Sequence, residues 1–552
     1  MGIEGSNEMP TSPSISDGTR ITPQGWRIRW NAASADRAYA DGWWRHNTLG
    51  DALRQEADAA PDRILIVDGD TRLGAAELYD RATRLAHAML KRFAPGSVVS
   101  FMLPNWHEAA VIYMATTLAG MVAHPILPSL RDHDLRFMLA DIGTSMIFTP
   151  GIFRGHDCGA MLARVAATLE TPPDIVVVRG AAGPHIAYDS LFDAIPDIGL
   201  PSLDADEIRM VMYTSGTTGR PKGVMHTHNS INALIRQIGA HWLIEPGDRF
   251  LVPSPISHIG GSIYAFETPL LFGTTAILME TWEPDAAVEI MVRERCTHMA
   301  GATPFLQHLL ASARKAGTRL PDLKLFICGG ASVPAALIRD AAGYFSKAVV
   351  SRVYGSTEVP VTTVGVIDRN DVDHAAETDG RAGIATLKIA DTGEIRAKGP
   401  QMLAGYVHAE DEADAFDDEG YYRTGDQGAL VDGDHLVVTG RIKDLIIRNG
   451  ENISPKEIED LLAAHPAIAE IAIVGVPHAR TGERAVAVIV ARGDAAVDVE
   501  MLATLLASLG VARFKYPEEV ALWDALPRND AGKVLKQQIR ATLVERTGTA
   551  DQ

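Results

Sequence analysis

The stretch from Tyr213 to Gly223, YTSGTTGRPKG, combines three kinds of group that bind phosphate. It holds three glycines, four serines or threonines and two cations. Glycines let backbone amides approach an anion, hydroxyls donate further hydrogen bonds, and Arg220 and Lys222 add positive charge. A solvated turn would account for any two of these residues, but not for the whole set. The stretch therefore predicts a polyphosphate-binding loop. It is not a Walker loop, because Gly216 is followed five residues later by Pro221 instead of Gly-Lys-Ser/Thr.

Five later stretches carry acids and cations of the kinds that contact nucleotides. They are Tyr354 to Glu358, Tyr422 to Asp426, Gly440 to Asp444, Asn449 to Pro455 and Pro527 to Lys533. With the phosphate-binding loop they resemble, in type and order, the motifs of the acyl-adenylate-forming superfamily, which includes acyl-CoA synthetases, luciferases and peptide-synthetase adenylation domains. The earlier stretch His124 to Phe137 resembles a motif of the acyl-CoA synthetase branch, nearest to ligases of cyclohexanecarboxylate and medium-chain fatty acids.

The resemblance implies a site for ATP, Mg²⁺ and coenzyme A. The implied catalytic residues are Lys533, Thr357, Glu358 and His258. Glu358 and Thr214 are the implied Mg²⁺ ligands, and a carboxylate suits a hard cation. The implied contacts to the nucleotide and coenzyme A are Thr214, Ser215, Gly216, Thr217, Thr218, Gly219, Lys222, Gly330, Ala331, Ser332, Tyr354, Gly355, Asp426, Arg441 and Gly450.

Most of these residues also fit an ordinary structural role. Asp426 would accept hydrogen bonds from the ribose hydroxyls, whereas Thr-Gly-Asp alone is a common turn. Arg441 would make a second ribose or phosphate contact, whereas a surface ion pair would explain it as well. His258 would lie near the acyl group, and a structural histidine fits that position equally.

Two lysines and one glycine imply that the enzyme works in two conformational states. Lys533 would neutralise the charge that builds up when a carboxylate attacks ATP. Lys443 falls at the family's hinge, where rotation would move the C-terminal domain between two faces. Gly450 would then approach the site and leave room for the pantetheine thiol.

Two residues near Lys533 carry separate expectations. Asp530 departs from the Ser or Thr that is usual at this position in the family, and its negative charge would weaken the approach of ATP. Lys536 is expected to be solvent-exposed.

The implied reaction has two steps: acyl-AMP forms with release of pyrophosphate, and a thiol then displaces AMP. We predict an ATP-dependent carboxylic acid:CoA ligase for a medium-chain or alicyclic acid. Ile259 to Ser262 offer no acid to pair with an amino-acid ammonium, which favours a plain carboxylic acid. The open alternatives are an aryl or steroid-side-chain acid ligase, an acyl-AMP ligase that loads a carrier protein, and a luciferase-like oxygenase. A non-catalytic binding protein is disfavoured, because the key motif residues are all present.

The length and composition of the chain indicate how many domains it has, which partners it excludes and in which compartment it works. A chain of 552 residues predicts more than one domain. Its formal net charge of −19 argues against nucleic-acid binding, so a local positive site must hold any polyanion. The three cysteines are far apart and show no zinc-ligand spacing, which favours a reducing cytoplasm. A homodimer stays open as the assembly.

The elements that must position these residues form an α/β pattern. Short apolar runs alternate with helical patterns, which predicts layered α/β subdomains with largely parallel sheets. A small β subdomain is expected over about 383–442, with a hairpin turn at Asp432-Gly433. An α+β pattern predicts a small mobile C-terminal domain, so the expected domains are 1–442 and 443–552. Residues 1–25 are expected to form a flexible tail.

One uncharged segment, Ala109 to Leu130, is long enough to raise the question of a membrane span. Its two prolines and His124 favour a buried helix followed by a strand instead. We therefore expect no integral membrane segment.

Overall fold

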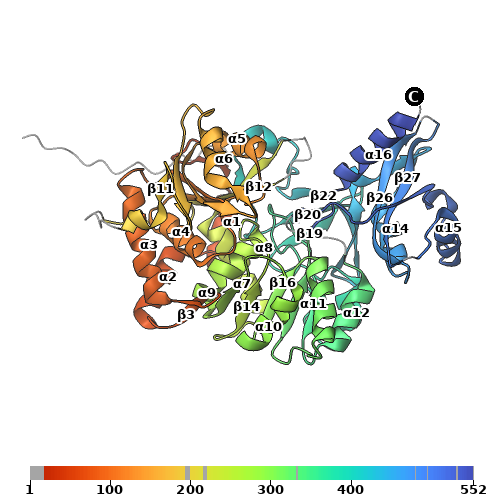
Figure 1. Ribbon diagram of the computed structural model, residues 1–552, viewed down its shortest axis with the longest axis horizontal. Helices are drawn as coiled ribbons and strands as arrows, with labels where there is room; N and C mark the ends of the chain where they lie inside the picture. The colour runs from red at the N-terminus through yellow and green to blue at the C-terminus, as the bar shows by residue number, and fades with distance from the viewer. Residues whose placement is uncertain are drawn as a thin grey trace, which may run out of the picture.

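The computed structural model describes residues 18–192, 199–214, 220–330, 333–478, 480–493, 495–529 and 532–550. Two large sheets covered by helices form the N-terminal part, and a smaller α/β unit lies at the other end of the molecule (Figure 1). Strands of a third, antiparallel sheet lie between them in this view. The predicted α/β class is confirmed.

The first large sheet carries the strands on both sides of the phosphate-binding loop. Its order is β11 (Ile186–Ala187), β10 (Asp174–Val178), β7 (Thr144–Pro150), β5 (Val98–Phe101), β6 (Val122–Pro125), β12 (Ile208–Thr214), β13 (Lys222–Thr227) and β21 (Gly405–Tyr406). Neighbours are parallel from β11 to β12, whereas β13 and β21 join antiparallel.

The second large sheet is parallel except for one edge. Its order is β18 (Val349–Arg352), β17 (Leu325–Cys328), β16 (His298–Gly301), β14 (Arg249–Val252), β15 (Thr275–Leu278), β3 (Ile64–Asp68) and β4 (Thr71–Gly74). Only β4 pairs antiparallel in this sheet. The carboxyl ends of the parallel strands therefore share one edge, where ligands of α/β sheets usually bind.

Helices cover these sheets and fill the space between them. They are α1 (Ala32–Ala40), α2 (Leu49–Ala59), α3 (Ala75–Leu90), α4 (His107–Leu118), α5 (Asp132–Asp141), α6 (Cys158–Ala166), α7 (His228–His241), α8 (Ile259–Ser262), α9 (Thr268–Phe272), α10 (Pro284–Glu294), α11 (Thr303–Lys315), α12 (Ala335–Tyr344) and α13 (Val372–Glu377). A π-helical turn, Ile263–Glu267, joins α8 to α9. Thr48 and Asp51 form a capping box at the start of α2.

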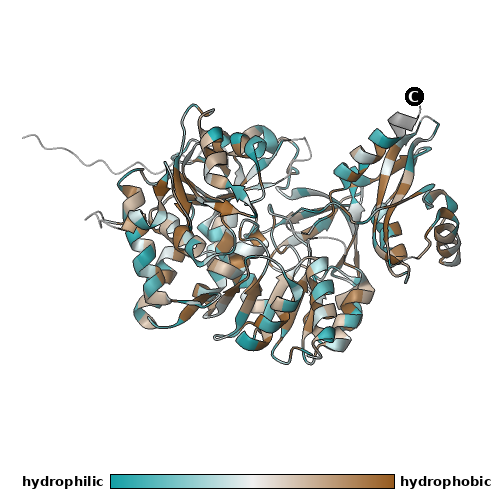
Figure 2. Ribbon diagram, in the orientation of Figure 1, coloured by the Kyte–Doolittle hydropathy of each residue, from teal (hydrophilic) through white to brown (hydrophobic). Residues whose placement is uncertain are grey.

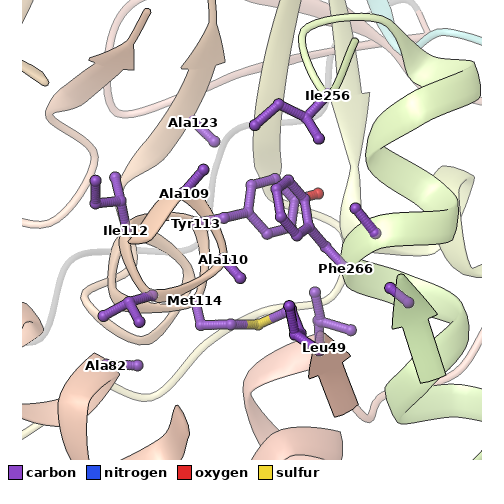
Figure 3. Packing of buried hydrophobic residues seen from close by; sticks show 14 of the residues in the cluster. Leu49, Ala82, Ala109, Ala110, Ile112, Tyr113, Met114, Ala123, Ile256 and Phe266 are labelled. Carbon is purple, nitrogen blue, oxygen red and sulfur yellow. The ribbon is translucent and has the colours of Figure 1, made fainter. Parts of the chain in front are cut away.

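Helix α4 shows why the uncharged segment is not a membrane span. Every residue from Ala109 to Leu118 is buried, and β6 follows as the predicted strand. Tyr113 of α4 stacks on Phe266, with ring centroids 4.5 Å apart, in a core that also includes Phe101 of the first sheet and Phe250 of the second (Figure 3). A helix that is apolar all round is buried in this way. Among the described residues, no helix is long and apolar enough to cross a membrane.

The hydropathy pattern follows the layers. Strands of both large sheets are mostly apolar, whereas many covering helices are polar on part of their surface (Figure 2). Strands buried on both faces of a parallel sheet have this continuous apolar character.

The third sheet is antiparallel and has four strands: β19 (Thr386–Ile389), β20 (Glu394–Lys398), β22 (Tyr422–Val431) and β23 (His435–Arg441). The predicted hairpin turn joins β22 to β23, with φ of 48° at Asp432 and 94° at Gly433. These left-handed angles are those of a tight hairpin turn, which favours Asp-Gly.

The C-terminal unit has its own sheet and core. The sheet runs β25 (Glu451–Ile453), β24 (Ile446–Arg448), β27 (Gly482–Ala491) and β26 (Ile468–His478), with β28 (Glu519–Leu522) also paired to β27. Helices α14 (Pro455–Ala463), α15 (Val499–Ser508) and α16 (Lys536–Ala550) complete it. Ile446, Ile473 and Leu502 are fully buried in its interior.

Two sequence-based expectations are wrong. The flexible tail does not reach residue 25, because β1 (Thr19–Ile21) pairs with β2 (Arg27–Arg29), and Arg20 and Thr22 are buried. Lys536 is only 25% exposed, since its Nζ lies 2.6 Å from Glu459 Oε1. Arg20 and Lys536 both have partners that are distant in the chain, Asp204 with Asp206 for Arg20 and Glu459 for Lys536.

Candidate active site

The candidate site begins at the carboxyl edge of the second sheet. Neighbouring strands β14, β16, β17 and β18 are followed by the loops that carry His258, Ala302, Gly330 and Tyr354. His258 is half-buried, and its carbonyl accepts hydrogen bonds from the backbone of Gly261 and Ser262 at the start of α8. The parallel sheet therefore brings together residues that are about a hundred positions apart in the chain.

A buried asparagine holds the loop that leads to His258. Asn105 Oδ1 accepts a hydrogen bond from the backbone of Ile256 at 3.0 Å. Asn105 Nδ2 donates to the carbonyls of Val252 and Ser254, both at 2.9 Å. Sequence reasoning missed Asn105, because an asparagine after Leu-Pro looks like an ordinary turn residue.

The segment from Tyr354 to Glu358 lies against β13 and β21 of the first sheet. His226 Nε2 donates to the carbonyl of Thr357 at 2.8 Å, while its Nδ1 lies 3.0 Å from Ser230 Oγ. Burial lowers the pKa of His226 to about 4. The neutral ring therefore has the hydrogen on Nε2, which positions the backbone between Thr357 and Glu358.

Glu358 is buried, with 8% of its surface exposed, and its Oε1 accepts a hydrogen bond from Tyr406 Oη at 3.1 Å. Tyr406 Oη also lies 3.2 Å from Tyr422 Oη, and burial raises the pKa of Tyr406. Both phenols therefore stay protonated as donors, and one lies against the carboxylate. A carboxylate oxygen held in this way fits the chemistry of a hard cation such as Mg²⁺.

Gly355 needs to be glycine for a steric reason. A Cβ placed on Gly355 would lie 2.6 Å from the backbone nitrogen of Val361. Gly330 has a different requirement, a φ of +83° that L side chains rarely adopt. Ala331 and Ser332 lie outside the described residues.

The phosphate-binding loop connects β12 to β13. Thr214 and Lys222 are opposite each other in this antiparallel pair, so they flank the loop at its base. Ser215, Gly216, Thr217, Thr218 and Gly219 lie outside the described residues. Lys222 Nζ lies 5.2 Å from the centre of the Tyr406 ring, so Lys222 and Glu358 contact the same tyrosine.

Asp426 and Arg441 are partners in the third sheet, where β22 and β23 place them opposite each other. Arg441 Nε lies 3.0 Å from Asp426 Oδ1. Tyr354 donates to the other carboxylate oxygen, with Oη 2.7 Å from Oδ2. Burial raises the pKa of Tyr354 well above its ordinary value, which keeps the phenol a donor. The structure thus brings Tyr354, Asp426 and Arg441 together.

Lys533 belongs to the C-terminal unit, yet it lies close enough to Arg441 and Asp426 for their charges to act on it. Its pKa is lowered by burial and by the charge of Arg441, while Asp426 and Asp444 oppose the shift. Asn529 fixes the backbone of Lys533 through two hydrogen bonds of 2.8 and 2.9 Å. Asp530 lies outside the described residues.

The loop before Lys533 packs on the large sheet. A Cβ placed on Gly532 would lie 3.6 Å from Ala302 Cβ and 3.6 Å from Pro304 Cγ, at the carboxyl end of β16. The C-terminal unit therefore contacts the same edge that carries His258, Gly330 and Tyr354.

Gly450 is not brought to the other site residues. It forms the exposed turn between β24 and β25 with Asn449, with φ of 84° and 51°. Within the described part of the chain, no atom beyond its neighbours lies within 4 Å of a Cβ placed on it. Lys443 is also exposed, in a short 3₁₀ helix (Ile442–Asp444) that precedes β24.

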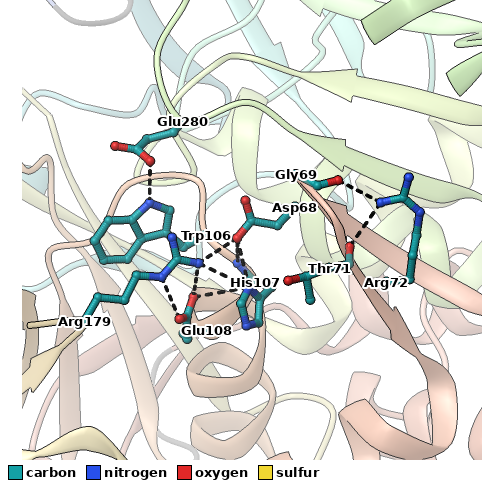
Figure 4. A network of polar contacts seen from close by, with 9 residues as sticks. All are labelled: Asp68, Gly69, Thr71, Arg72, Trp106, His107, Glu108, Arg179 and Glu280. Carbon is teal, nitrogen blue, oxygen red and sulfur yellow. Dashed lines mark hydrogen bonds and ion pairs between the residues drawn. The ribbon is translucent and has the colours of Figure 1, made fainter. Parts of the chain in front are cut away.

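A second polar cluster, away from these residues, contains metal-ligand types. Donor atoms of Asp68, His107 and Glu108 lie within 4.8 Å of one another. Arg179 Nη2 lies 2.7 Å from Asp68 Oδ2 and 2.7 Å from Glu108 Oε2, with its guanidinium over the Trp106 ring (Figure 4). Hydrogen bonds from His107 and Arg179 hold the pKa of Asp68 at about 2 against the opposing effect of burial. The guanidinium supplies the positive charge here, so the cluster is an ion-pair network joining the two sheets.

A family model described as "AMP-binding enzyme" matches residues 53–407, more than half of the chain. The chain belongs to the AMP-binding enzyme family. A model of the AMP-binding enzyme C-terminal domain matches residues 457–533 of this family member. The second match ends at Lys533.

Named relatives of this AMP-binding enzyme are acyl-CoA ligases. It is 33% identical over 561 residues to the medium-chain fatty-acid–CoA ligase of Escherichia coli K12, with 97% of this chain and 98% of that protein covered. It is 31% identical over 511 residues to the 3-[(3aS,4S,7aS)-7a-methyl-1,5-dioxo-octahydro-1H-inden-4-yl]propanoyl:CoA ligase of Rhodococcus jostii, covering 89% and 98%.

Solved structures agree in fold. ATP-bound MatB from Rhodopseudomonas palustris superposes with a TM-score of 0.81 at 28% identity, covering 90% of this chain and 99% of that one. The o-succinylbenzoate CoA synthetase of Bacillus subtilis, in complex with its acyl-adenylate intermediate, gives 0.77 at 26% identity, covering 89% and 97%. The predicted family, enzyme class and two-part architecture are confirmed: this is an AMP-forming acyl-CoA synthetase.

Proposed function

We propose that the protein is an ATP-dependent carboxylic acid:CoA ligase that acts on a medium-chain or alicyclic acid. One observation carries this proposal most directly. Lys533 of the C-terminal unit is close enough to Arg441 and Asp426 to feel their charges, and neighbouring Gly532 packs at the carboxyl edge of the second sheet. Such an ammonium can neutralise charge between two anions that must react.

In the first step, the residues of the large unit bind and orient ATP. Arg220, Lys222 and the phosphate-binding loop hold the polyphosphate, and Asp426 accepts hydrogen bonds from the ribose hydroxyls. Glu358 and Thr214 would hold Mg²⁺, which when bound reduces the negative charge that repels the attacking carboxylate. Lys533 donates to the carboxylate and the α-phosphate oxygens, and Thr357 supplies a further donor. Catalysis comes mainly from positioning and from charge neutralisation.

In the second step, the C-terminal unit turns about Lys443, which divides a domain of residues 1–442 from one of residues 443–552. Lys443 suits this role because it is exposed, and a hinge needs only a few residues that can absorb a change of backbone angles. The turn at Gly450 then approaches the adenylate, and its missing side chain leaves room for the pantetheine thiol of coenzyme A. The thiol displaces AMP without a covalent enzyme intermediate.

The substrate proposal rests on the relatives and on the composition near His258. The Escherichia coli relative is named for medium-chain fatty acids and the Rhodococcus jostii relative for a bulky ring-bearing acid. We place the acyl group near His258, next to Ile259 to Ser262, which contain no acid. An aryl or steroid-side-chain acid is the second candidate, favoured by the Rhodococcus jostii relative.

Pyrophosphate exchange into ATP tests the first step against a panel of acids. We expect exchange with octanoate or cyclohexanecarboxylate, less with ferulate, and none with an amino acid. AMP release on addition of coenzyme A then tests the second step. Exchange without CoA-dependent AMP release would favour the carrier-protein alternative, and no exchange with any acid would contradict the ligase.

The cysteines support a cytoplasmic location for this proposed enzyme. Cys158, Cys296 and Cys328 are all buried and unpaired. Burial raises the pKa of Cys296 and Cys328 to about 12, so neither thiol is a nucleophile at neutral pH. A homodimer is the assembly we propose to test alongside, by light scattering.

A further inference from the structure

A short acidic helix contacts the two cations that follow the phosphate-binding loop. The 3₁₀ helix η3 (Ala409–Glu412) contains Asp411, whose Oδ2 lies 3.1 Å from Arg220 Nη2 and whose Oδ1 lies 3.5 Å from Lys222 Nζ. The side chain of Asp411 is only 6% exposed, whereas that of neighbouring Glu410, 3.3 Å from Arg220, is 70% exposed. Asp411 is therefore the buried carboxylate that contacts both cations.

The position of Asp411 is fixed from one side by the start of the described chain. Glu412 Oε1 accepts a hydrogen bond from the backbone of Tyr406 at 3.0 Å, and Glu412 Oε2 lies 3.8 Å from Arg29 Nη1. The backbone of Arg29 donates to Ala404, and its guanidinium lies 3.6 Å from the centre of the Phe416 ring. Strand β2 thus anchors η3, although it precedes the part matched by the family model.

The other end of the loop is tied to the same segment. His408 Nε2 lies 2.7 Å from Asp141 Oδ1, and Tyr213 Oη donates to Asp141 Oδ2 at 2.5 Å. Tyr213 directly precedes Thr214, where the loop begins. Residues 408–411 therefore contact both flanks of the loop, through Asp141 on one side and Asp411 on the other.

We propose that Asp411 is a positioning residue that competes with the polyphosphate of ATP for Arg220 and Lys222. This inference rests on the proposed function, because it assigns those cations to the polyphosphate. A carboxylate and a phosphate of like charge repel each other, and little water is present around Asp411 to screen the repulsion. When the phosphates take one or both cations, the buried carboxylate loses partners, which opposes tight binding. Asp411 therefore weakens the binding of ATP and pyrophosphate, and it draws the cations back as pyrophosphate leaves.

The isosteric change Asp411→Asn tests the competition by the sign of its effect. We expect the dissociation constant for Mg-ATP, measured by calorimetry, to fall about fivefold. The constant for AMP, which lacks the β- and γ-phosphates, should change less than twofold. Asp414→Asn removes the same charge at an exposed position three residues further along, and should leave both constants within twofold of wild type.

Two results would overturn the proposal: unchanged or weaker binding of Mg-ATP by Asp411→Asn, or an equal gain for AMP. AMP binding also reports that the variant is folded. If it is not folded, Asp411→Ser is used with the same expected gain, while Asp411→Glu, which keeps the charge, should match wild type. A wild-type protein that binds neither Mg-ATP nor AMP would contradict the ligase function itself and not this competition.

Discussion

Tyr354 and Asp426 are 72 residues apart, yet the phenol of one donates to the carboxylate of the other, with Oη 2.7 Å from Oδ2. Tyr354 follows the last strand of the second large sheet, and Asp426 belongs to the antiparallel third sheet. The bond therefore joins two layers at the point where Lys533 arrives from the C-terminal unit. Asp426 keeps one donor on each oxygen, Tyr354 on Oδ2 and Arg441 on Oδ1.

Replacing Tyr354 with Phe removes one of these donors and keeps the ring. We expect the KM for ATP to rise about tenfold with kcat within threefold of wild type, since a hydrogen bond to a charged group contributes about 1.5–3 kcal/mol. Tyr421→Phe, a partly buried tyrosine nearby in the chain, is the control and should leave the KM unchanged. An equal fall of kcat and kcat/KM would show that Tyr354 acts in the transition state instead.

Replacing Lys533 with Ala should separate the two half-reactions. We expect acyl-AMP formation to fall about 10²- to 10³-fold, since one preorganised charge contact is lost. Conversion of supplied acyl-AMP to the thioester should stay within threefold of wild type. Lys536→Ala, whose lysine pairs with Glu459, should slow neither step. Equal losses in both half-reactions would contradict the role given to Lys533.

The pH dependence of acyl-AMP formation should report the Lys533 ammonium. Burial and Arg441 lower its pKa from the ordinary 10.5, and only the protonated form neutralises the anions. Activity should therefore be lost as pH rises through a midpoint below 10.5. Arg441→Gln removes a repelling charge and should move this alkaline limb to higher pH at saturating ATP. Lys533→Arg should abolish the limb, and an unchanged limb in that variant would assign it to another group.

Replacing Gly450 with Leu should affect only the second half-reaction. In the described state the new side chain meets open space, so acyl-AMP formation should be within threefold of wild type. Thioester formation should fall at least 30-fold, because the side chain would fill the proposed thiol path. Gly433 is a matched control, since it has a φ of +94° in a similar hairpin turn, and no atom of the described residues lies within 4 Å of its Cβ position. Gly433→Leu has the same backbone strain and should form thioester normally.

Acid should destabilise the fold through its buried histidines. Burial lowers the pKa of His124 to about 3 and that of His226 to about 4. The unfolded chain binds protons at these residues below about pH 6.5, whereas the folded chain does not. The stability is thus present above pH 6.5 and is lost as pH falls toward those values. Between pH 6.5 and 5, each of the two histidines should lower the free energy of unfolding by about 2 kcal/mol.

Urea unfolding at pH 7 and pH 5 measures this loss. The difference in unfolding free energy between pH 7 and pH 5 should be smaller in His124→Asn by about the contribution of one histidine. This holds even if the variant is less stable than wild type at pH 7. His133→Asn, at an exposed position, should keep the full difference. Equal pH dependence of wild type and His124→Asn would show that His124 also titrates in the folded protein.

Much of the fold could be predicted because its signals are local. Helix α4 with β6 replaces the membrane span that charge alone would have allowed. The Asp432-Gly433 turn follows from backbone conformation. The burial of Arg20 and of Lys536 was mispredicted, because their partners, Asp204 with Asp206 and Glu459, are distant in the chain.

The candidate site was also predictable only in part. Residue types and their order in the sequence determined the chemistry, a polyphosphate loop with acids and a lysine, because each motif carries its own donors and acceptors. Only the tertiary structure decided which groups meet. Parallel strands bring the loops of His258, Gly330 and Tyr354 to one edge, and the docked C-terminal unit places Lys533 beside Asp426. Asn105, Tyr406 and Asp411 became visible only there, since a buried polar group is defined by partners that the linear sequence does not show.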